Sequence, residues 1–139
     1  MTRVVIDTSV WIRYLIRSSV AIQTLIEELW LGEHVQVITA PELHAELQGV
    51  LARPAIQHFV PPAAGQVLLK TLQLKAVFLP VLGEIPAFTR DPKDDKFIAC
   101  ALAGQAQALI TVDKDLLILE MVEQVRIVTP DAFIRRFHA

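Results

Sequence analysis

The stretch Val4-Val5-Ile6-Asp7-Thr8-Ser9 decides the fold class, because an apolar strand runs here directly into a helix start. The apolar residues predict a strand over residues 3–6. Thr8 and Ser9 are good caps for a helix that extends to about residue 17. A strand followed at once by a helix is typical of an α/β protein.

The rest of the chain repeats this alternation. Further strands are predicted at residues 34–39, 76–79, 108–112 and 125–128. Further helices are predicted at residues 18–31, 41–53, 61–75, 94–104 and 115–122, and from Pro130 onward. Strands separated by helices pair in parallel through right-handed crossovers. We therefore expect a single domain over residues 1–139, with a central parallel sheet of four to five strands flanked by helices.

The composition favours a protein outside the membrane. With 53% hydrophobic residues among 139, the chain can bury a sizeable core. Its longest charge-free runs, residues 54–69 and 97–112, are shorter than the roughly 20 apolar residues of a membrane helix. No signal-peptide pattern is visible. The single cysteine, Cys100, excludes an intramolecular disulfide and a Cys-rich zinc site, and a cytoplasmic location is the expectation.

The net charge decides little about partners. A value of −2 argues at first against a nucleic-acid partner. If four of the 15 acidic residues bind metal, 11 remain against 13 Lys and Arg, which is a balance of +2.

Two acids directly follow predicted strands. Asp7 follows the first strand, and Asp113 follows the apolar run at residues 108–112. Ligands of parallel α/β sheets bind beyond the carboxyl ends of the strands, so both side chains are candidates for chemistry. Each acid could instead cap the next helix, and for Asp115 capping is the favoured interpretation.

The helix predicted from Pro41 carries two acids on one side, four residues apart. Glu42 lies in the first turn, where the helix dipole favours an acid, and we interpret it as structural. Glu46 lies beside Leu43 and Leu47 at the margin of the buried stripe. A carboxylate there is costly unless it is paired or bound to a cation. The alternative is a Glu46 that reaches out to solvent.

Three acids occur in the run Arg90-Asp91-Pro92-Lys93-Asp94-Asp95-Lys96, at the start of a predicted helix. Acids are common at helix starts. Asp95 shares a helix face with Ile98 and other inward-packing residues, so its carboxylate is expected to lie against the sheet edge. Asp94 is expected to be the N-cap and Asp91 to belong to the turn.

Four segments thus each direct one acid toward the same edge. Hard oxygen ligands fit Mg²⁺ or Mn²⁺. The four histidines share no metal-ligand spacing: His34, His44, His58 and His138. Such cations bind phosphates and make a water molecule nucleophilic, which favours a metal-dependent nuclease.

The same four segments carry a resemblance. They are Val-Val-Ile-Asp7-Thr8-Ser9, Pro41-Glu42-Leu43-His44-Ala45-Glu46-Leu47, Arg90-Asp91-Pro92-Lys93-Asp94-Asp95-Lys96-Phe97-Ile98-Ala99 and Leu109-Ile110-Thr111-Val112-Asp113-Lys114-Asp115. In this order they resemble the PIN domain, and within it the toxin components of bacterial toxin–antitoxin systems. The match spans nearly the whole chain. No single segment is specific for the family, but the four segments in this order are.

The resemblance implies a site, a cofactor and partners. It implies metal ligands at Asp7, Glu46, Asp95 and Asp113, with Asp115 assisting. It further implies a Mg²⁺- or Mn²⁺-dependent endoribonuclease that cleaves single-stranded RNA, forms a homodimer and has an antitoxin protein as partner. Many relatives carry Asn where this chain has Ser9, whose hydroxyl can still orient Asp7.

Other residues have more than one interpretation. Six cations near the proposed edge could contact phosphates or simply be solvated: Arg13, Arg17, Arg53, Lys93, Lys96 and Lys114. Trp11 and Trp30 fall on apolar helix faces, which favours the core over base stacking, and Cys100 is expected to be buried.

Two other functions compete with the nuclease. One is a catalytically silent PIN fold that binds RNA or a protein partner, which an absent ligand would favour. The other is a phosphate-accepting receiver-like domain. That domain would require a second acid beside Asp7 and a Lys after the last strand, but Ile6 and Thr8 flank Asp7 and Val128-Thr129-Pro130 contains no Lys.

Overall fold

A computed structural model describes residues 1–137 of the chain, so His138 lies outside the described residues. Its centre is a six-stranded sheet with the order β3-β2-β1-β4-β6-β5. The strands are β1 (Thr2–Ile6), β2 (Val35–Thr39), β3 (Val77–Phe78), β4 (Ala108–Ile110), β5 (Met121–Val122) and β6 (Val125–Val128). Neighbouring strands are parallel except for β5 and β6, which pair antiparallel. The five predicted strands all form, and β5 is an additional edge strand.

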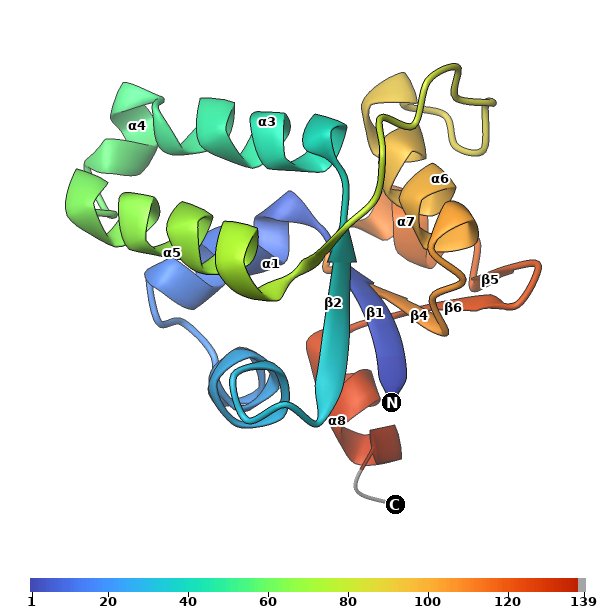
Figure 1. The fold of residues 1–139 in the computed structure, drawn as a ribbon, viewed down its shortest axis with the longest axis horizontal. Helices are drawn as coiled ribbons and strands as arrows, with labels where there is room; N and C mark the ends of the chain where they lie inside the picture. The colour runs from blue at the N-terminus through green and yellow to red at the C-terminus, as the bar shows by residue number, and fades with distance from the viewer. Residues whose placement is uncertain (138–139) are drawn as a thin grey trace.

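Helices cover both faces of this sheet (Figure 1). The α-helices are α1 (Thr8–Leu15), α2 (Val20–Gln23), α3 (Pro41–Leu51), α4 (Pro54–Gln57), α5 (Pro62–Lys75), α6 (Asp95–Ala103), α7 (Lys114–Leu117) and α8 (Pro130–Phe137). A π-helix, η1 (Thr24–Trp30), continues α2, and a 3₁₀ turn, η2 (Pro92–Asp94), precedes α6. Among the described residues, no helix has both the length and the apolar character that crossing a bilayer requires.

The predicted helix over residues 115–122 is wrong in its second half. Helix α7 ends at Leu117, and the chain then forms the β5–β6 hairpin. Glu120 and Glu123 bracket β5 with φ angles of 61° and 51°, in the left-handed region that reverses the chain sharply. Pro54, expected to end a helix, also begins the short helix α4.

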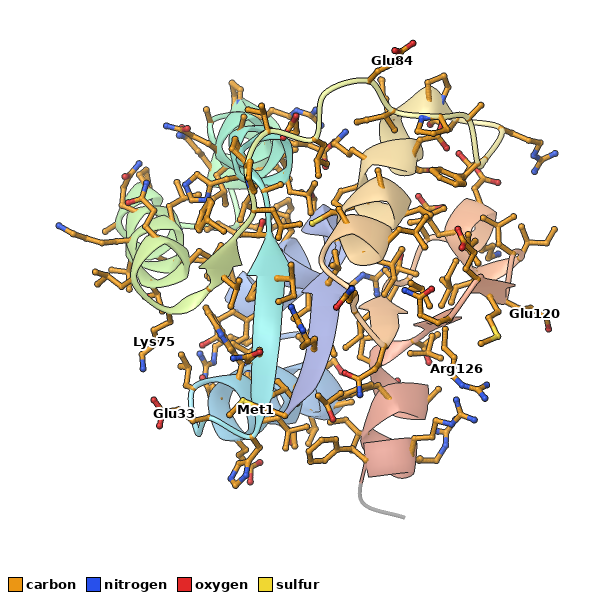
Figure 2. All side chains as sticks on the ribbon, turned by 45° about the vertical axis from the view of Figure 1, so that its right-hand side comes forward. Met1, Glu33, Lys75, Glu84, Glu120 and Arg126 are labelled. Atoms are coloured by element: carbon orange, nitrogen blue, oxygen red, sulfur yellow. The ribbon has the colours of Figure 1, made fainter. Side chains whose placement is uncertain are left out.

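The alternation of side chains along β1 divides the core into two layers. Val4 and Ile6 pack against α1, η1 and α5 on one face, whereas Val5 packs against α6 on the other. Trp11 and Trp30 belong to the first layer, with ring centroids 5.3 Å apart, and Cys100 is buried in the second. These three residues confirm their predicted place in the core. The charged side chains labelled in Figure 2 project outward: Glu33, Lys75, Glu84, Glu120 and Arg126.

The strand order brings the two strand-end acids to one edge. β1 and β4 are neighbours, and Ile6 lies opposite Ile110. Asp7 and Asp113 therefore leave the sheet on the same side. β2 ends at that side as well and leads into α3 (Figure 1). Glu46 on α3 lines the same cleft as Asp7 and Asp113.

Candidate active site

Asp7 is a buried acid with a full set of hydrogen-bond donors. Its side chain is 3% exposed, and Oδ1 accepts from the Ser9 hydroxyl at 2.5 Å and from the Val10 N–H at 3.2 Å. Oδ2 accepts from the Thr111 hydroxyl. Burial raises the pKa of Asp7 above its usual value, and these hydrogen bonds oppose the rise. Asp7 thus caps α1 and lies at the carboxyl end of β1. The Ser9 hydroxyl orients its carboxylate, as expected.

Thr111 connects Asp7 to Asp113. The Thr111 hydroxyl donates to Asp7 and accepts from the Asp113 N–H at 2.9 Å. Asp113 in turn caps α7, because its Oδ1 accepts from the Asp115 N–H at 2.8 Å. The capping role considered for Asp115 is therefore filled by Asp113. Asp115 instead accepts from exposed Arg90 at 3.1 Å.

Asp94 completes the acidic group. Carboxylate oxygens of three acids lie within 4.8 Å of one another, the one such group among residues 1–137: Asp94, Asp113 and Asp115. The pKa of Asp94 is raised to about 6, first by burial and then by four acidic neighbours: Asp113, Asp91, Asp7 and Asp115. Crowded carboxylates destabilise one another unless a cation lies among them. This oxygen-only set fits a divalent cation such as Mg²⁺ or Mn²⁺.

Asp95 packs inward as expected, but it is not one of the three acids in this group. Its side chain is buried at 5% exposure, and Oδ1 accepts from the N–H groups of Phe88 and Thr89 at 3.0 and 2.8 Å. The Thr89 hydroxyl donates to the same oxygen at 3.0 Å. The 3₁₀ turn η2 sets the entry into α6 so that Asp94 lines the cleft, while Asp95 holds the preceding loop. Asp91 caps η2 through the Lys93 N–H.

Glu46 faces the same edge but is already partnered. Its Oε1 lies 2.6 Å from Lys96 Nζ, and its Oε2 accepts from the Thr8 hydroxyl. Glu42 lies one turn earlier in α3. It accepts a hydrogen bond from the Leu82 N–H at 2.7 Å and so anchors the loop that follows β3, which agrees with its structural interpretation.

A cleft of about 460 Å³ lies over these acids. Its acidic lining residues are Asp7, Glu46, Asp91, Asp94 and Asp113. Its other lining residues are Thr8, Ser9, Ile12, Arg13, Val50, Arg53, Lys93 and Phe97. One surface therefore combines an anionic centre, apolar area and three of the six cations predicted to meet phosphates.

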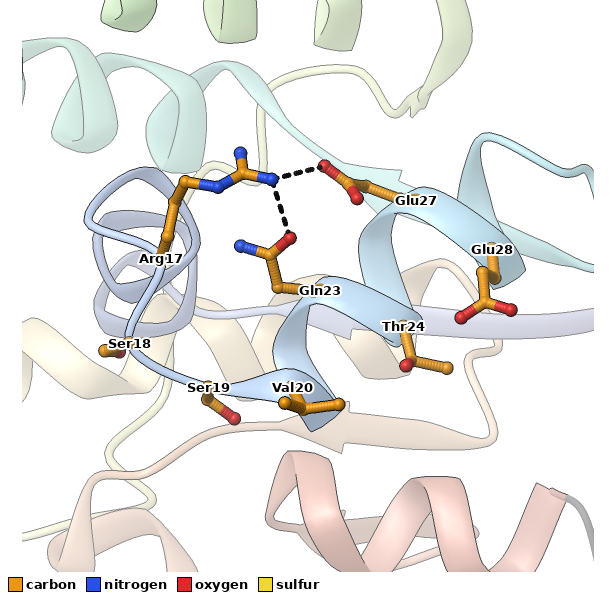
Figure 3. Close-up of a pocket in the computed structure, with 8 residues that line it drawn as sticks. All are labelled: Arg17, Ser18, Ser19, Val20, Gln23, Thr24, Glu27 and Glu28. Atoms are coloured by element: carbon orange, nitrogen blue, oxygen red, sulfur yellow. Dashed lines mark hydrogen bonds and ion pairs between the residues drawn. The ribbon is translucent and has the colours of Figure 1, made fainter.

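The remaining three cations lie elsewhere. Arg17 lines a separate hollow at the start of α2, where Figure 3 shows its guanidinium directed at Gln23 and Glu27. The distances are 2.9 Å to Gln23 Oε1 and 3.6 Å to Glu27 Oε2. Lys96 is bound to Glu46, and exposed Lys114 does not line the cleft. Of the two interpretations left open for these cations, phosphate contact has no support at Arg17, Lys96 and Lys114.

Residues 3–115 match the family model of the PIN domain. The chain belongs to the PIN domain family. No curated protein sequence matches this PIN domain chain. In structure it is similar to a chain of VapBC2 from Rickettsia felis, solved bound to a DNA fragment from their promoter, with a TM-score of 0.60 and 13% identity. That match covers 91% of this PIN domain chain and 97% of the other.

A second solved structure has the same PIN-like arrangement. It is VapC20 from Mycobacterium tuberculosis, described as a sarcin–ricin loop cleaving toxin. The TM-score is 0.56 at 17% identity, and the match covers 88% of this chain and 98% of that one. At these identities the likeness shows the shared fold.

Sequence reasoning missed three contributors to the site. Thr8 and Thr111 were interpreted as a cap and a strand residue, but their hydroxyls bind Glu46 and Asp7. The position of Thr111, two residues before Asp113, could have indicated that its hydroxyl accepts a hydrogen bond from the Asp113 N–H. Asp94 occupies the N-cap position of α6 as predicted, but its side chain makes no capping hydrogen bond and lines the cleft, a role that the sequence analysis did not assign to it.

Proposed function

We propose that this PIN domain is a divalent-metal-dependent endoribonuclease that cleaves single-stranded RNA in the cytoplasm. The observation that carries the proposal is the acidic group of Asp94, Asp113 and Asp115. Asp94 and Asp113 line the cleft beside Asp7. The three acids of the group are the proposed cation ligands. Asp7 and Glu46 complete the acidic wall, and Asp95 has a structural role.

The chain's own residues explain why a cation is needed. An RNA phosphate is an anion, so the crowded carboxylates repel it in the absence of a cation. A bound Mg²⁺ or Mn²⁺ supplies Lewis-acid stabilisation of the phosphate and lowers the pKa of water. Thr111 and Ser9 fix the Asp7 carboxylate, and the Asp113 cap fixes the turn that carries Asp115. These hydrogen bonds keep the acids in place before substrate arrives.

The cleft walls favour a flexible nucleic-acid strand. Arg13 and Arg53 are exposed on the wall that α1 and the end of α3 form, where they can bind phosphates beside the scissile one. Ile12 and Val50 are half-buried at the cleft and offer apolar area for unpaired bases.

The structural relatives support a toxin role. One relative is described as a toxin that cleaves the sarcin–ricin loop, and another was solved as the pair VapBC2. We propose by analogy that this chain is the toxin of a toxin–antitoxin pair and that an antitoxin protein is its partner. Exposed apolar residues such as Val67 and Leu74 on α5 support the further proposal of a homodimer. Co-purification with the product of the adjacent gene and sedimentation of the purified chain test these two proposals.

Cleavage assays test the activity. The purified chain is incubated with unstructured RNA and with a sarcin–ricin-type stem-loop, with Mn²⁺, with Mg²⁺ and with chelator. We expect cleavage that requires the cation and is lost in Asp113→Asn. RNA binding without cleavage under all cation conditions would instead identify a catalytically silent binding module.

A further inference from the structure

Arg90 is an exposed arginine at the rim of the acidic group. Its Nη2 lies 3.1 Å from Oδ1 of Asp115, one of the three acids in that group. The side chain of Arg90 is 85% exposed and that of Asp115 is 42% exposed. Because water screens so open an ion pair, the pair contributes little to stability and is readily exchanged. The guanidinium is therefore available to another anion that binds at this place.

The backbone on both sides of Arg90 is fixed by hydrogen bonds. The Thr89 N–H donates to Asp95 Oδ1 at 2.8 Å, and the Thr89 hydroxyl oxygen accepts from the Asp91 N–H at 3.1 Å. Asp91 in turn accepts from the Lys93 N–H at 3.0 Å at the start of η2. A long side chain thus projects into solvent from an ordered turn, which lowers the entropy lost when Arg90 binds a ligand.

Most hydrogen-bond donors of Arg90 are unused. A guanidinium carries five N–H donors in a planar fork. Within residues 1–137, the structure gives this fork one hydrogen bond, from Nη2 to Asp115. Phosphate oxygens match the fork through two parallel charge-assisted hydrogen bonds. Arg90 can therefore bind a phosphate with donors that the folded chain leaves open.

The acidic group has a need for such a charge. Of the Lys and Arg side chains in the described part of the chain, Arg90 alone is paired with an acid of this group, because the other ion pairs join Arg17 to Glu27 and Lys96 to Glu46. An RNA phosphate that approaches these carboxylates meets repulsion, which a cationic side chain at the rim offsets.

From these contacts we propose that Arg90 is a substrate-binding residue, whose guanidinium exchanges Asp115 for the RNA phosphate that binds at the acidic group. The proposal deepens the proposed nuclease function and rests on it. Arg90 lies outside the set of six cations that the sequence indicated, because its place beside Asp115 joins two segments 25 residues apart.

A role as a mere counter-charge makes a different prediction. If Arg90 only relieves the crowding of the acids, its removal would leave phosphate binding unchanged once Mn²⁺ neutralises them. In both roles the loss of a positive charge should leave Mn²⁺ binding as tight as in wild type or tighter. Phosphate binding to the Mn²⁺-loaded chain therefore separates the two roles.

A nucleoside 5′-monophosphate is the probe, because it carries a phosphate but has no phosphodiester bond to cleave. Titration calorimetry measures its binding to the full chain saturated with Mn²⁺. We expect Arg90→Met to weaken binding by about 10-fold or more, since hydrogen bonds to a charged group are lost. Arg90→Lys should weaken it by only about three-fold, since it keeps the charge but not the fork.

Lys114→Met is the matched control. Lys114 is an exposed cation between Asp113 and Asp115 in the sequence, and within residues 1–137 the structure gives it no ion pair. Because solvent and salt screen such a charge, its removal should change monophosphate binding by less than about two-fold.

Mn²⁺ titrated alone separates this inference from the proposed metal site. Wild type and Arg90→Met should both bind the ion. Equal monophosphate binding by the two chains, or none by Mn²⁺-loaded wild type, would overturn the inference and leave the metal site standing. A wild type that binds no Mn²⁺ would overturn the metal site itself and the inference with it.

Discussion

The Thr111 hydroxyl donates a hydrogen bond to Asp7, so neighbouring strands of the sheet are joined at their carboxyl ends by side chains as well as by the backbone. Thr111 is fully buried, and its oxygen also accepts the Asp113 N–H. One hydroxyl therefore satisfies a buried carboxylate and a turn amide together.

Replacement of this hydroxyl tests its contribution to stability. Thr111→Val keeps the shape of the side chain but leaves the Asp113 N–H and an Asp7 oxygen without their partner. We expect the free energy of unfolding, measured in urea, to fall by about 1–3 kcal/mol. Thr71→Val is the control. Thr71 lies on α5 and donates only to the carbonyl oxygen of Val67 in the same helix, at an exposed position. A comparable loss of stability in Thr71→Val would contradict the prediction.

Asp7→Asn should stabilise the chain in chelator at pH 7. Burial raises the folded-state pKa of Asp7, so the group destabilises the fold as pH rises through the unfolded value and reaches its full cost above the folded one. Removing the charge should add on the order of 1–2 kcal/mol of stability at pH 7 and less near pH 4, where wild type is partly protonated.

Thermal melts in chelator at both pH values measure this effect. Mn²⁺ should reverse the order by stabilising wild type more than the variant. A variant that is less stable than wild type at pH 7 in chelator would show that the hydrogen bonds from Ser9, Val10 and Thr111 outweigh the cost of the buried charge.

The neighbouring acids at the start of α6 should have opposite roles. Asp94→Asn should lower kcat/KM for RNA cleavage by about 100-fold, because it removes a proposed ligand from the cleft. In chelator at pH 7 it should raise Tm, because burial and four acidic neighbours raise the pKa of Asp94 to about 6 in the folded chain. Asp95→Asn should lower Tm, because its carboxylate is buried and accepts three hydrogen bonds from Phe88 and Thr89. The reverse pattern would restore the sequence-based assignment of Asp95.

Two arginines in the cleft should govern RNA affinity. Arg13→Ala and Arg53→Ala should each weaken RNA binding and lower the slope of log K against log salt by about 0.7, since each removes one phosphate contact. Arg17→Ala is the matched control, because Arg17 lies in the separate hollow and binds Gln23 and Glu27. Fluorescence anisotropy over a salt series measures all three, and an equal effect of Arg17→Ala would argue against the proposed path.

Strand positions and strand-end acids could be predicted because they depend on local pattern. An unbroken apolar run that ends in Asp places that Asp at the carboxyl edge, as for Asp7 and Asp113. The spatial order of the strands could not be predicted, since it depends on contacts between distant segments. β5 was missed because residues 115–122 were assigned to one helix. The chain reversal there depends on positive φ angles at Glu120 and Glu123, and no glycine marks those positions in the sequence.

The choice between Asp94 and Asp95 at α6 depends on rotation about the helix axis. Each residue turns an α-helix by about 100°, so choosing between adjacent acids requires the orientation of the helix, which periodicity fixes only coarsely. The hydrogen bonds from Phe88 and Thr89 decide that orientation, and they come from a loop whose path the sequence did not reveal. The contact of Lys96 with Glu46 joins two helices and has no local signature.

Both margins of the sheet are formed by strands of only two residues, β3 and β5. So short an edge offers few unpaired backbone groups on which another chain could add a strand. The sheet is therefore a poor template for aggregation or for edge-to-edge extension between molecules. We therefore expect any assembly of two copies to form through side-chain packing, which interface mutations can disrupt without disturbing the strands that lead to the acids.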